Sequence, residues 1–230
     1  MLIYMFNNFV FNNNDRYLYN DKEWKYIYEH QSEYPDTLFS LAKRNKEALS
    51  FVYQYKDRKD ISMSIKEDIN QDDIPLLLQW DKRWGYKKYG DDYIAVNGCG
   101  PTCLSMVVGH LTKNDRFNPY FISQYAYKRG YLNDIGTSWE LMTVGARTLG
   151  VNVEEIALDE NIIRDCLDSG YPIICSMSKG IFTSTGHFIV LREYKDGKIY
   201  VNDPNSIEKS KRGYEFKDIK NQIKNLWCYY

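Results

Sequence analysis

The sequence is 230 residues long and carries 30 Lys plus Arg against 31 Asp plus Glu, with hydrophobic residues at 43%. This size and composition predict one globular domain with an appendage, or two small domains, with a core large enough to fold without disulfide bonds. The net charge of −1 provides no long-range field that would gather phosphate backbones or anionic lipid, so we expect neither nucleic acid nor a membrane as partner.

The cysteines limit the cofactors and the redox compartment. They are odd in number and lack paired CxxC spacing, which argues against a disulfide scaffold and against a zinc ribbon. We therefore expect at least one free thiol, no metal and no cofactor. The five cysteines are Cys99, Cys103, Cys166, Cys175 and Cys228.

The start of the chain, MLIYMFNNFVFNNND, has no features of a secretory leader. No Lys or Arg precedes its apolar residues, and no small-residue cleavage site follows them. Nor does any stretch reach the roughly 18 consecutive apolar residues that a membrane span requires. The sequence predicts a cytoplasmic protein as the chain stands, or a secreted one where a leader is missing upstream.

The N-terminal part is predicted to be helical. Residues 1–21 are rich in Asn and Tyr without clear periodicity, and we expect them to be mostly irregular. From Asp21 the apolar residues fall at helical spacing, and Pro35 opens a second helix. Helical spacing then continues from Ala48 to Tyr55. These patterns predict a small bundle of short helices.

A polar and charged run over residues 55–73 marks the expected domain boundary. We therefore expect a helical N-terminal region over 1–70 and a second domain over 71–230. The first region has three open roles, as a structural cap, as a recognition element for a partner, or as a segment that covers a groove like a propeptide. Of these we favour the structural role.

Helical signals come first in the second domain. Gly100 and Pro101 lead into apolar residues at helical spacing, with Pro just inside the helix start. A capping box over 137–140 starts a second helix, which is expected to stop at Gly150. A third, short helix is expected over about 160–168.

Strand signals follow the helices. Segments rich in β-branched and aromatic residues predict strands over 171–177, 186–194 and 198–203. Helices first and strands last is the order of an α+β fold. We expect Trp139 and Trp227 to lie in its core.

Cys99, in the string NGCGPTC, is the candidate nucleophile. It comes just before a predicted helix, where unpaired N–H groups and the positive end of the helix macrodipole favour a thiolate. Gly98 and Gly100 beside it leave room for a substrate backbone. The alternative is that Cys99 is a small buried apolar residue with a structural role. A catalytic role therefore requires a partner base.

The partner base must be an imidazole that shares the proton of the thiol and later protonates the leaving group. His30 belongs to the helical N-terminal region, and His110 lies about 16 Å along the helix that Cys99 precedes. His187 remains, after Gly186 at the start of an apolar strand. The alternative for His187 is a hydrogen-bonded histidine of the core.

Asp203 is the candidate that fixes the tautomer and the ring plane of His187. The prediction depends on a hairpin. With a type I turn in the string YKDG and Gly197 as a left-handed bulge residue, Ile189 pairs with Asp203 and both catalytic side chains project from one face. A two-residue turn at DG would place them on opposite faces, because a one-residue slip flips every side chain.

Gln79 is the candidate side-chain donor for the oxyanion, beside the backbone N–H of Cys99. It follows the apolar run 74–78, a position that taken alone is typical of a surface or turn residue. The aromatic residues near it are expected to pack an irregular loop, with lining of a substrate groove as the alternative. These residues are Trp80, Trp84, Tyr86 and Tyr89.

The order Gln79, Cys99, His187, Asp203 resembles that of papain-fold cysteine peptidases, which carry glutamine, cysteine, histidine, and asparagine or aspartate. Five strings over about residues 74–228 are similar to the bacteriocin-processing, double-glycine-leader branch, peptidase family C thirty-nine-like; they are QWDKRWGYKKYG, NGCGPTCLSMV, GTSWELM, GHFIVL and NDPNS. The resemblance implies a papain-like α+β fold. It makes Cys99 the nucleophile, His187 the general base and acid, Asp203 the orienting residue and Gln79 the oxyanion donor.

The function that the resemblance implies is a cysteine peptidase acting on a peptide or protein substrate. Leader processing is less expected, because such enzymes are usually fused to a transporter and this sequence predicts no membrane span. Acyl transfer or deamidation by the same triad, and a non-catalytic peptide-binding module, are the alternatives. At the position of Cys103 the family more often has a small residue. Cys103 therefore leaves open a redox pair with Cys99 or a metal site with His110. We expect it to be a core residue.

Overall fold

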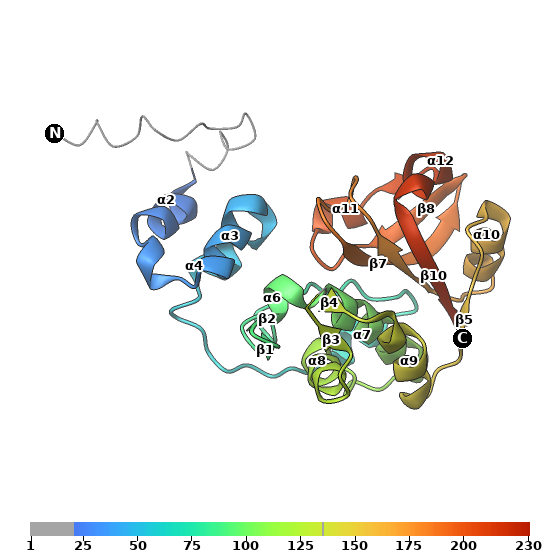
Figure 1. Ribbon diagram of the computed structural model, residues 1–230, viewed down its shortest axis with the longest axis horizontal. Helices are drawn as coiled ribbons and strands as arrows, with labels where there is room; N and C mark the ends of the chain where they lie inside the picture. Colours follow the sequence, from blue (N-terminus) through green and yellow to red (C-terminus); the bar gives the residue numbers. More distant parts are fainter. Residues whose placement is uncertain (1–20, 135) are drawn as a thin grey trace. The chain divides into compact units, whose positions relative to one another are not determined.

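The computed structural model describes residues 21–134 and 136–230 of the chain (Figure 1). The chain divides into two compact units, Met1–Lys59 and Asp60–Tyr230. The second unit thus begins earlier than the expected boundary near residue 71. The expectation of irregular structure for residues 1–21 lies outside the described residues, apart from Asp21.

The earlier boundary has a packing reason. Helix α5 (Lys66–Ile69) lies in the polar run, yet Ile65 and Ile69 are fully buried. A Cβ atom placed on Gly109 would lie 2.9 Å from Ile65 and 3.5 Å from Ile69, so both side chains press against the helix that carries Gly109. These two isoleucines, together with the bonds from Arg83 to Asp68 at 2.6 Å and from Lys113 to the carbonyl of Ile69 at 3.1 Å, attach the segment to the second unit.

From residue 21 on, the first unit contains the short helices that the apolar spacing predicts. The side chain of Asp21 accepts hydrogen bonds from the backbone N–H groups of Glu23 and Trp24, which fixes the start of the first helix. The elements are α2 (Lys22–Glu29), η2 (Gln31–Glu33), α3 (Asp36–Arg44), η3 (Lys46–Ala48) and α4 (Leu49–Tyr53). Their buried side chains, such as Ile27, Leu38 and Leu41, occupy the predicted positions.

Helices and short strand pairs form one half of the second unit (Figure 1). The predicted helix after Gly98 is confirmed, whereas the helix that begins at Pro119 was not expected, although Asn118 caps it and proline stands at its first position. The helices are α6 (Ile94–Asn97), α7 (Cys99–Thr112), α8 (Pro119–Lys128), η4 (Trp139–Met142) and α9 (Val144–Thr148). The strand pairs are β1 (Lys88–Tyr89) with β2 (Asp92–Tyr93) and β3 (Leu132–Asn133) with β4 (Gly136–Thr137).

A six-stranded antiparallel sheet in the order β5-β10-β6-β7-β8-β9 forms the other half. The three predicted strands are confirmed as β6 (Ile173–Met177), β7 (His187–Lys195) and β8 (Lys198–Asn202). The strands β5 (Val153–Glu155), β9 (Gly213–Tyr214) and β10 (Ile223–Tyr229) complete the sheet. The helices near the sheet are α10 (Glu160–Asp168), which was predicted, α11 (Ile207–Ser210), α12 (Phe216–Ile219) and η5 (Lys220–Gln222). This α+β architecture agrees with the expected fold class.

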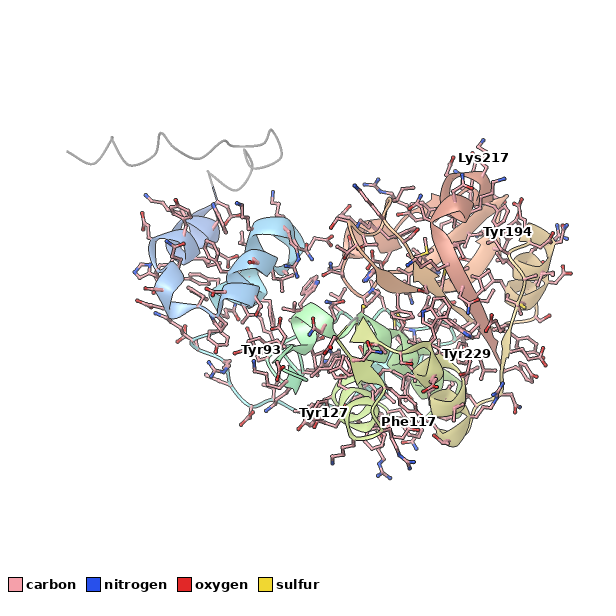
Figure 2. All side chains as sticks on the ribbon, viewed as in Figure 1. Tyr93, Phe117, Tyr127, Tyr194, Lys217 and Tyr229 are labelled. Atoms are coloured by element: carbon pink, nitrogen blue, oxygen red, sulfur yellow. The ribbon has the colours of Figure 1, made fainter. Side chains whose placement is uncertain are left out.

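The sheet separates two apolar clusters. One contains Ile174, Val190 and Trp227 of the sheet together with residues of α7, and every residue of α7 from Gly100 to Gly109 is buried. Helix α7 is covered on all sides, which explains why apolar residues occur on every face of it. The other cluster contains the alternate residues of the strands, packed against α10. Figure 2 labels two residues that join these layers: Tyr194 of β7, which donates to Glu160 of α10, and Tyr229 of β10, which donates to Met142 of η4.

The predicted helix from the capping box to Gly150 is interrupted. Ser138 accepts from the backbone N–H of Glu140 and starts η4, but Thr143 has φ −114° and ψ −85°, outside the helical region. The expectation that Trp139 belongs to the core is wrong, because Trp139 is 45% exposed and covers the edge of the fully buried Trp227. Its ring packs against Trp227, with the ring centroids 5.5 Å apart, and leaves the rest of its surface to solvent.

Candidate active site

Cys99 is the first residue of α7, directly after the short helix α6. The two glycines beside it have a packing reason. A Cβ atom on Gly98 would lie 2.5 Å from the backbone oxygen of Ile94, and one on Gly100 would lie 2.9 Å from the side chain of Thr137. The residues beside Cys99 are therefore small because α6 and β4 approach the backbone closely.

The sulfur of Cys99 lies among hydrogen-bond donors. Burial by itself raises the pKa of this thiol. The side chain of His187 and the backbone N–H groups of Phe188 and Gly100 stabilise the thiolate and together outweigh burial, so the pKa is lowered from its ordinary value. Cys99 is thus prepared to exist as a thiolate.

His187 is the first residue of β7, and its side chain is 7% exposed. Its Nε2 lies 2.7 Å from Oδ1 of Asp203, which leaves Nδ1 as the ring nitrogen for the bond with Cys99. Burial disfavours the imidazolium, but the carboxylate of Asp203 and the Cys99 thiolate favour it and raise the pKa of His187 to about 10. The geometry supports an ion pair of thiolate and imidazolium.

Asp203 directly follows β8 and is fully buried. Its Oδ1 accepts from His187 and from the backbone N–H of Asn205 at 2.8 Å. Its own backbone N–H donates to Oγ of Ser210 at 2.9 Å. Two donors thus hold Oδ1, and the backbone of Asp203 is held separately, so the carboxylate fixes the ring plane of His187 and the proton on Nε2.

The hairpin that brings His187 and Asp203 together differs from the expected one. The turn is the two-residue turn at Asp196 and Gly197, with φ of 51° and 71°, and Lys195 pairs with Lys198. The predicted turn is therefore wrong.

A β-bulge at Arg192 corrects the register. Leu191 pairs with Val201 and Val190 with Asn202, so the next position places Ile189 opposite Asp203, as expected. The extra residue in β7 cancels the slip that the tight turn introduces, because each one-residue shift reverses the face of every side chain.

Gln79 is 3% exposed, and it is connected to two other parts of the site. Its backbone N–H donates to the carbonyl of Pro204 at 2.8 Å. Its Nε2 donates to the carbonyls of Ala95 at 2.7 Å and Val96 at 3.3 Å, in the helix that precedes Cys99. Gln79 thus connects the loop directly after Asp203 to α6, the helix that precedes Cys99.

The residues on both sides of Gln79 are attached to the end of β8 and to the loop after it. The side-chain amide of Asn202 donates to the carbonyls of Ile74 at 3.0 Å and Pro75 at 3.1 Å. The indole N–H of Trp80 donates to the carbonyl of Asn205 at 3.3 Å. The structure therefore brings all four predicted site residues into one region of the second unit.

Two residues of this region were not predicted as part of the site. Tyr89 is fully buried with its hydroxyl 3.0 Å from Oγ1 of Thr137, and burial together with the charge of Cys99 raises its pKa to about 12. Its burial, and that of Trp84, agree with the expected packing role of the aromatic residues. Lys209 lies with Nζ 4.0 Å from Oδ2 of Asp203, and no sequence pattern indicated it.

Cys103 is fully buried, and burial together with the charge of Cys99 raises its pKa well above the ordinary value. It is the core residue that we expected. Among residues 21–134 and 136–230, no group of three or more His, Cys, Asp or Glu side chains is arranged to hold a metal ion. His30 lies in the first unit, where its ring stacks on Tyr26.

A cysteine at the start of a buried helix, facing a histidine and an aspartate on an antiparallel sheet, is the papain-like arrangement of an α+β fold. The model of the Peptidase_C39 like family matches residues 71–230, and the chain belongs to this family. The resemblance noted in the sequence is thereby confirmed. No curated protein gives a significant sequence match.

Two solved structures are similar to the chain. The peptidase domain of Streptococcus ComA, a bi-functional ABC transporter involved in a quorum sensing pathway, is 22% identical, with 57% of this chain and 89% of that chain covered and a TM-score of 0.43. A protein from Bacillus anthracis described as a C39-like peptidase is 12% identical, with 74% and 98% covered and a TM-score of 0.49. In the part of the present chain that the structure describes, no helix is both long enough and apolar enough to span a membrane.

Proposed function

We propose that the second unit is a cysteine peptidase that hydrolyses peptide bonds of a peptide or protein substrate through Cys99, His187 and Asp203. The observation that carries this proposal is the place of His187: its Nε2 lies 2.7 Å from Oδ1 of Asp203, and its side chain lowers the pKa of the Cys99 thiol. Family membership points to the same chemistry.

Acylation begins from the ion pair. The Cys99 thiolate attacks the carbonyl carbon of the scissile bond, and the carbonyl oxygen becomes an oxyanion. The imidazolium of His187 then gives the proton on Nδ1 to the leaving amine, the carbon–nitrogen bond breaks, and a thioester on Cys99 remains. Asp203 keeps the second proton on Nε2 throughout.

The oxyanion needs donors that point to the place where its charge develops. The backbone N–H of Cys99 at the helix start is one. The second is the side-chain amide of Gln79, whose shorter bond to Ala95 anchors it while the longer contact to Val96, at 3.3 Å, is the one that a substrate oxyanion replaces.

Deacylation uses the neutral imidazole that acylation leaves. Nδ1 of His187 accepts a proton from water as the water oxygen attacks the thioester carbon. The carbon–sulfur bond then breaks, the carboxylic acid product leaves, and the thiolate and imidazolium are restored. Acyl transfer to an amine and deamidation of a glutamine side chain follow the same steps with another nucleophile or substrate.

The proposal is tested by the pH dependence of Cys99 alkylation with iodoacetamide, followed site by site by mass spectrometry. We expect Cys99 to react well below the ordinary thiol pKa of about 8.5, and the reaction at low pH to disappear in His187→Ala. A library of unstructured peptides then reports hydrolysis, with Cys99→Ala as the inactive control.

Two outcomes would contradict the proposal. Alkylation of Cys99 only near the ordinary thiol pKa, with no hydrolysis, indicates a peptide-binding module that has kept the fold. Conversion of peptides to amine adducts or to deamidated products, with intact backbones, assigns the same triad to acyl transfer or deamidation.

A further inference from the structure

Two further cysteines line one pocket on the face of the sheet that lies away from α7. Cys166 is in the last turn of α10, and Cys228 is near the end of β10. The pocket has a volume of about 320 Å³, which is within the size range of small-molecule sites. Ile156, Ile162 and Tyr171 form part of its wall. The structure therefore places two thiols at one site outside the proposed triad.

Backbone hydrogen bonds hold the segments that carry the two cysteines. The carbonyl of Cys166 accepts from the backbone N–H of Tyr171 at 3.0 Å. The next residue, Pro172, accepts through its carbonyl from the backbone N–H of Tyr229 at 2.9 Å. Tyr229 directly follows Cys228, so the short segment between α10 and β6 joins the end of α10 to the end of β10. The folded backbone thus fixes the two cysteines relative to one another.

The two side chains also interact. Cys228 is buried in the apolar cluster between the sheet and α10, and Cys166 packs against this cluster. Burial raises the pKa of the Cys228 thiol, and the side chain of Cys166, the second largest cause, raises it further. Cys228 is therefore a protonated thiol near pH 7. Cys166 is only half-buried, so a small molecule in the pocket meets its sulfur first.

We propose that Cys166 and Cys228 are a modification site, a thiol pair that a small-molecule disulfide converts into an intramolecular disulfide bond. In the first step the sulfur of Cys166 bonds to one sulfur of the reagent, the S–S bond of the reagent breaks, and a small thiol leaves with the proton of Cys166. In the second step the sulfur of Cys228 displaces the other half of the reagent, which leaves as a thiol with the proton of Cys228. Two cysteines are oxidised, and one reagent disulfide is reduced to two thiols.

The two steps differ in what favours them. Exposure favours the first, because the reagent must reach the sulfur. The second is intramolecular, so the high effective concentration of the neighbouring thiol drives it. The raised pKa of Cys228 makes this step slow near pH 7 and faster as the pH rises.

The test uses the full chain with Cys99→Ala, so the proposed nucleophile cannot react and the outcome does not depend on the proposed function. The folded protein is incubated with hydroxyethyl disulfide at about pH 8, where thiol exchange is faster than at neutral pH. Remaining thiols are blocked with N-ethylmaleimide in denaturant, and peptides are identified by mass spectrometry without reduction. We expect one linked pair of peptides, carrying Cys166 and Cys228. Cys103 and Cys175, both fully buried, should be recovered as blocked thiols.

Two single variants in this background test the order of the steps. Cys228→Ala keeps the exposed thiol, and we expect the mixed disulfide between Cys166 and the reagent to accumulate. In Cys166→Ala the remaining thiol is 3% exposed, so we expect Cys228 to react at least about tenfold more slowly than Cys166 does in the other variant. Equal rates would overturn the proposed order. The linked peptides of the parent decide the existence of the pair without either variant.

Two results in the parent would overturn the proposal. A stable mixed disulfide on Cys166, with no linked peptide, would show that the two sulfurs cannot meet in the folded protein. Linkage of Cys166 or Cys228 to Cys103 or Cys175 would show that the reaction takes place in unfolded chains.

Thermal unfolding gives a second readout on the same samples. The bond closes the chain over residues 166–228, which removes conformational entropy from the unfolded state. We expect Tm to rise by at least about 5 °C on linkage and to return on reduction with dithiothreitol. A lower Tm in the linked protein would show that the bond distorts the fold, which contradicts a pair placed together by the native structure.

Discussion

Val190 pairs with Asn202 across β7 and β8, and this register carries His187 and Asp203 to the same face of the sheet. The two strands adopt this register only because Arg192 is an extra residue in β7. It offsets the shift that the tight two-residue turn introduces. Without that residue the carboxylate would point away from the imidazole. The candidate triad therefore depends on a bulge outside the site itself.

Deletion of Arg192 tests this dependence. The part of β7 that carries His187 then shifts by one residue against β8, and Asp203 leaves the face that His187 occupies. We expect kcat/KM for peptide hydrolysis to fall at least about a hundredfold and at most about 10⁴-fold, the cost of a wrong imidazole tautomer. The same deletion should move the reactivity of Cys99 toward that of an ordinary thiol.

The matched control is Arg192→Ala, which keeps the extra residue and removes only a partly exposed side chain that pairs with Glu193 at 3.5 Å. Its activity is expected to stay within about twofold of the parent, because partly exposed ion pairs of this kind contribute little. Equal losses in the two variants would assign the effect to the side chain of Arg192 rather than to the register.

The hairpin shows where sequence reasoning reached its limit. The strands were predictable from their β-branched and aromatic residues, and the string DG is itself a signal for a two-residue turn. The bulge at Arg192 has no such signal, because any residue can be the extra one and only the opposite strand reveals it. The register beyond the bulge was therefore predicted correctly, whereas the turn and the pairing next to it were predicted incorrectly, because Tyr194 pairs with Ile199.

The site residues also fall into two groups, those that a local sequence feature indicates and those that only the folded chain brings together. Cys99 could be selected because the start of a helix carries a pattern of its own, and His187 because the sequence places the other two histidines elsewhere. The bonds from Gln79 to Ala95 and Pro204 join segments distant in the chain, so no local pattern indicates them. Lys209 is a lysine in a polar segment, and only the folded loop places its charge near Asp203.

Gly100→Ala is expected to destabilise the second unit. The new methyl group would lie 2.9 Å from Cγ2 of Thr137 and 3.0 Å from its Cβ, so the backbone near Cys99 or the strand β4 must move. Overpacking of this kind costs about 1–3 kcal/mol of unfolding free energy, measured by urea denaturation.

The partner variant Thr137→Ala removes the nearer of these atoms. In a double-mutant cycle it should recover part of the loss caused by Gly100→Ala. Strict additivity of the two substitutions would mean that the two residues do not press on one another, and that Gly100 is required for another reason.

Gln79→Ala separates oxyanion stabilisation from thiol activation. The amide contacts the turn before Cys99 but is not among the groups that lower the pKa of its thiol. We therefore expect kcat to fall by about 100-fold, typical of the loss of one oxyanion donor, while the pH profile of Cys99 alkylation stays the same. A change in both measurements would show that Gln79 positions the nucleophile instead.

The pKa of His187 also predicts a pH-dependent stability, which is cleanest with Cys99→Ala because the thiolate and its proton are then absent. Asp203 raises the pKa of His187 above the ordinary value of 6.5, to about 10 with the thiolate present. A group whose pKa is raised by folding contributes stability that is complete below its unfolded pKa and is lost as the pH rises through its folded pKa. Cys99 is one of the groups that raise this pKa, so the upper end of the window lies below 10 in this background.

Comparison of Cys99→Ala with Cys99→Ala plus Asp203→Asn measures this contribution. We expect the aspartate to stabilise the fold by about 2–4 kcal/mol at pH 6 and progressively less above pH 6.5, because the neutral imidazole no longer benefits from the carboxylate. Urea unfolding at several pH values between 5 and 10 gives the difference directly. A difference that is constant across that range would mean that Asp203 acts through packing and its backbone contacts alone, and that it does not hold the charge of His187.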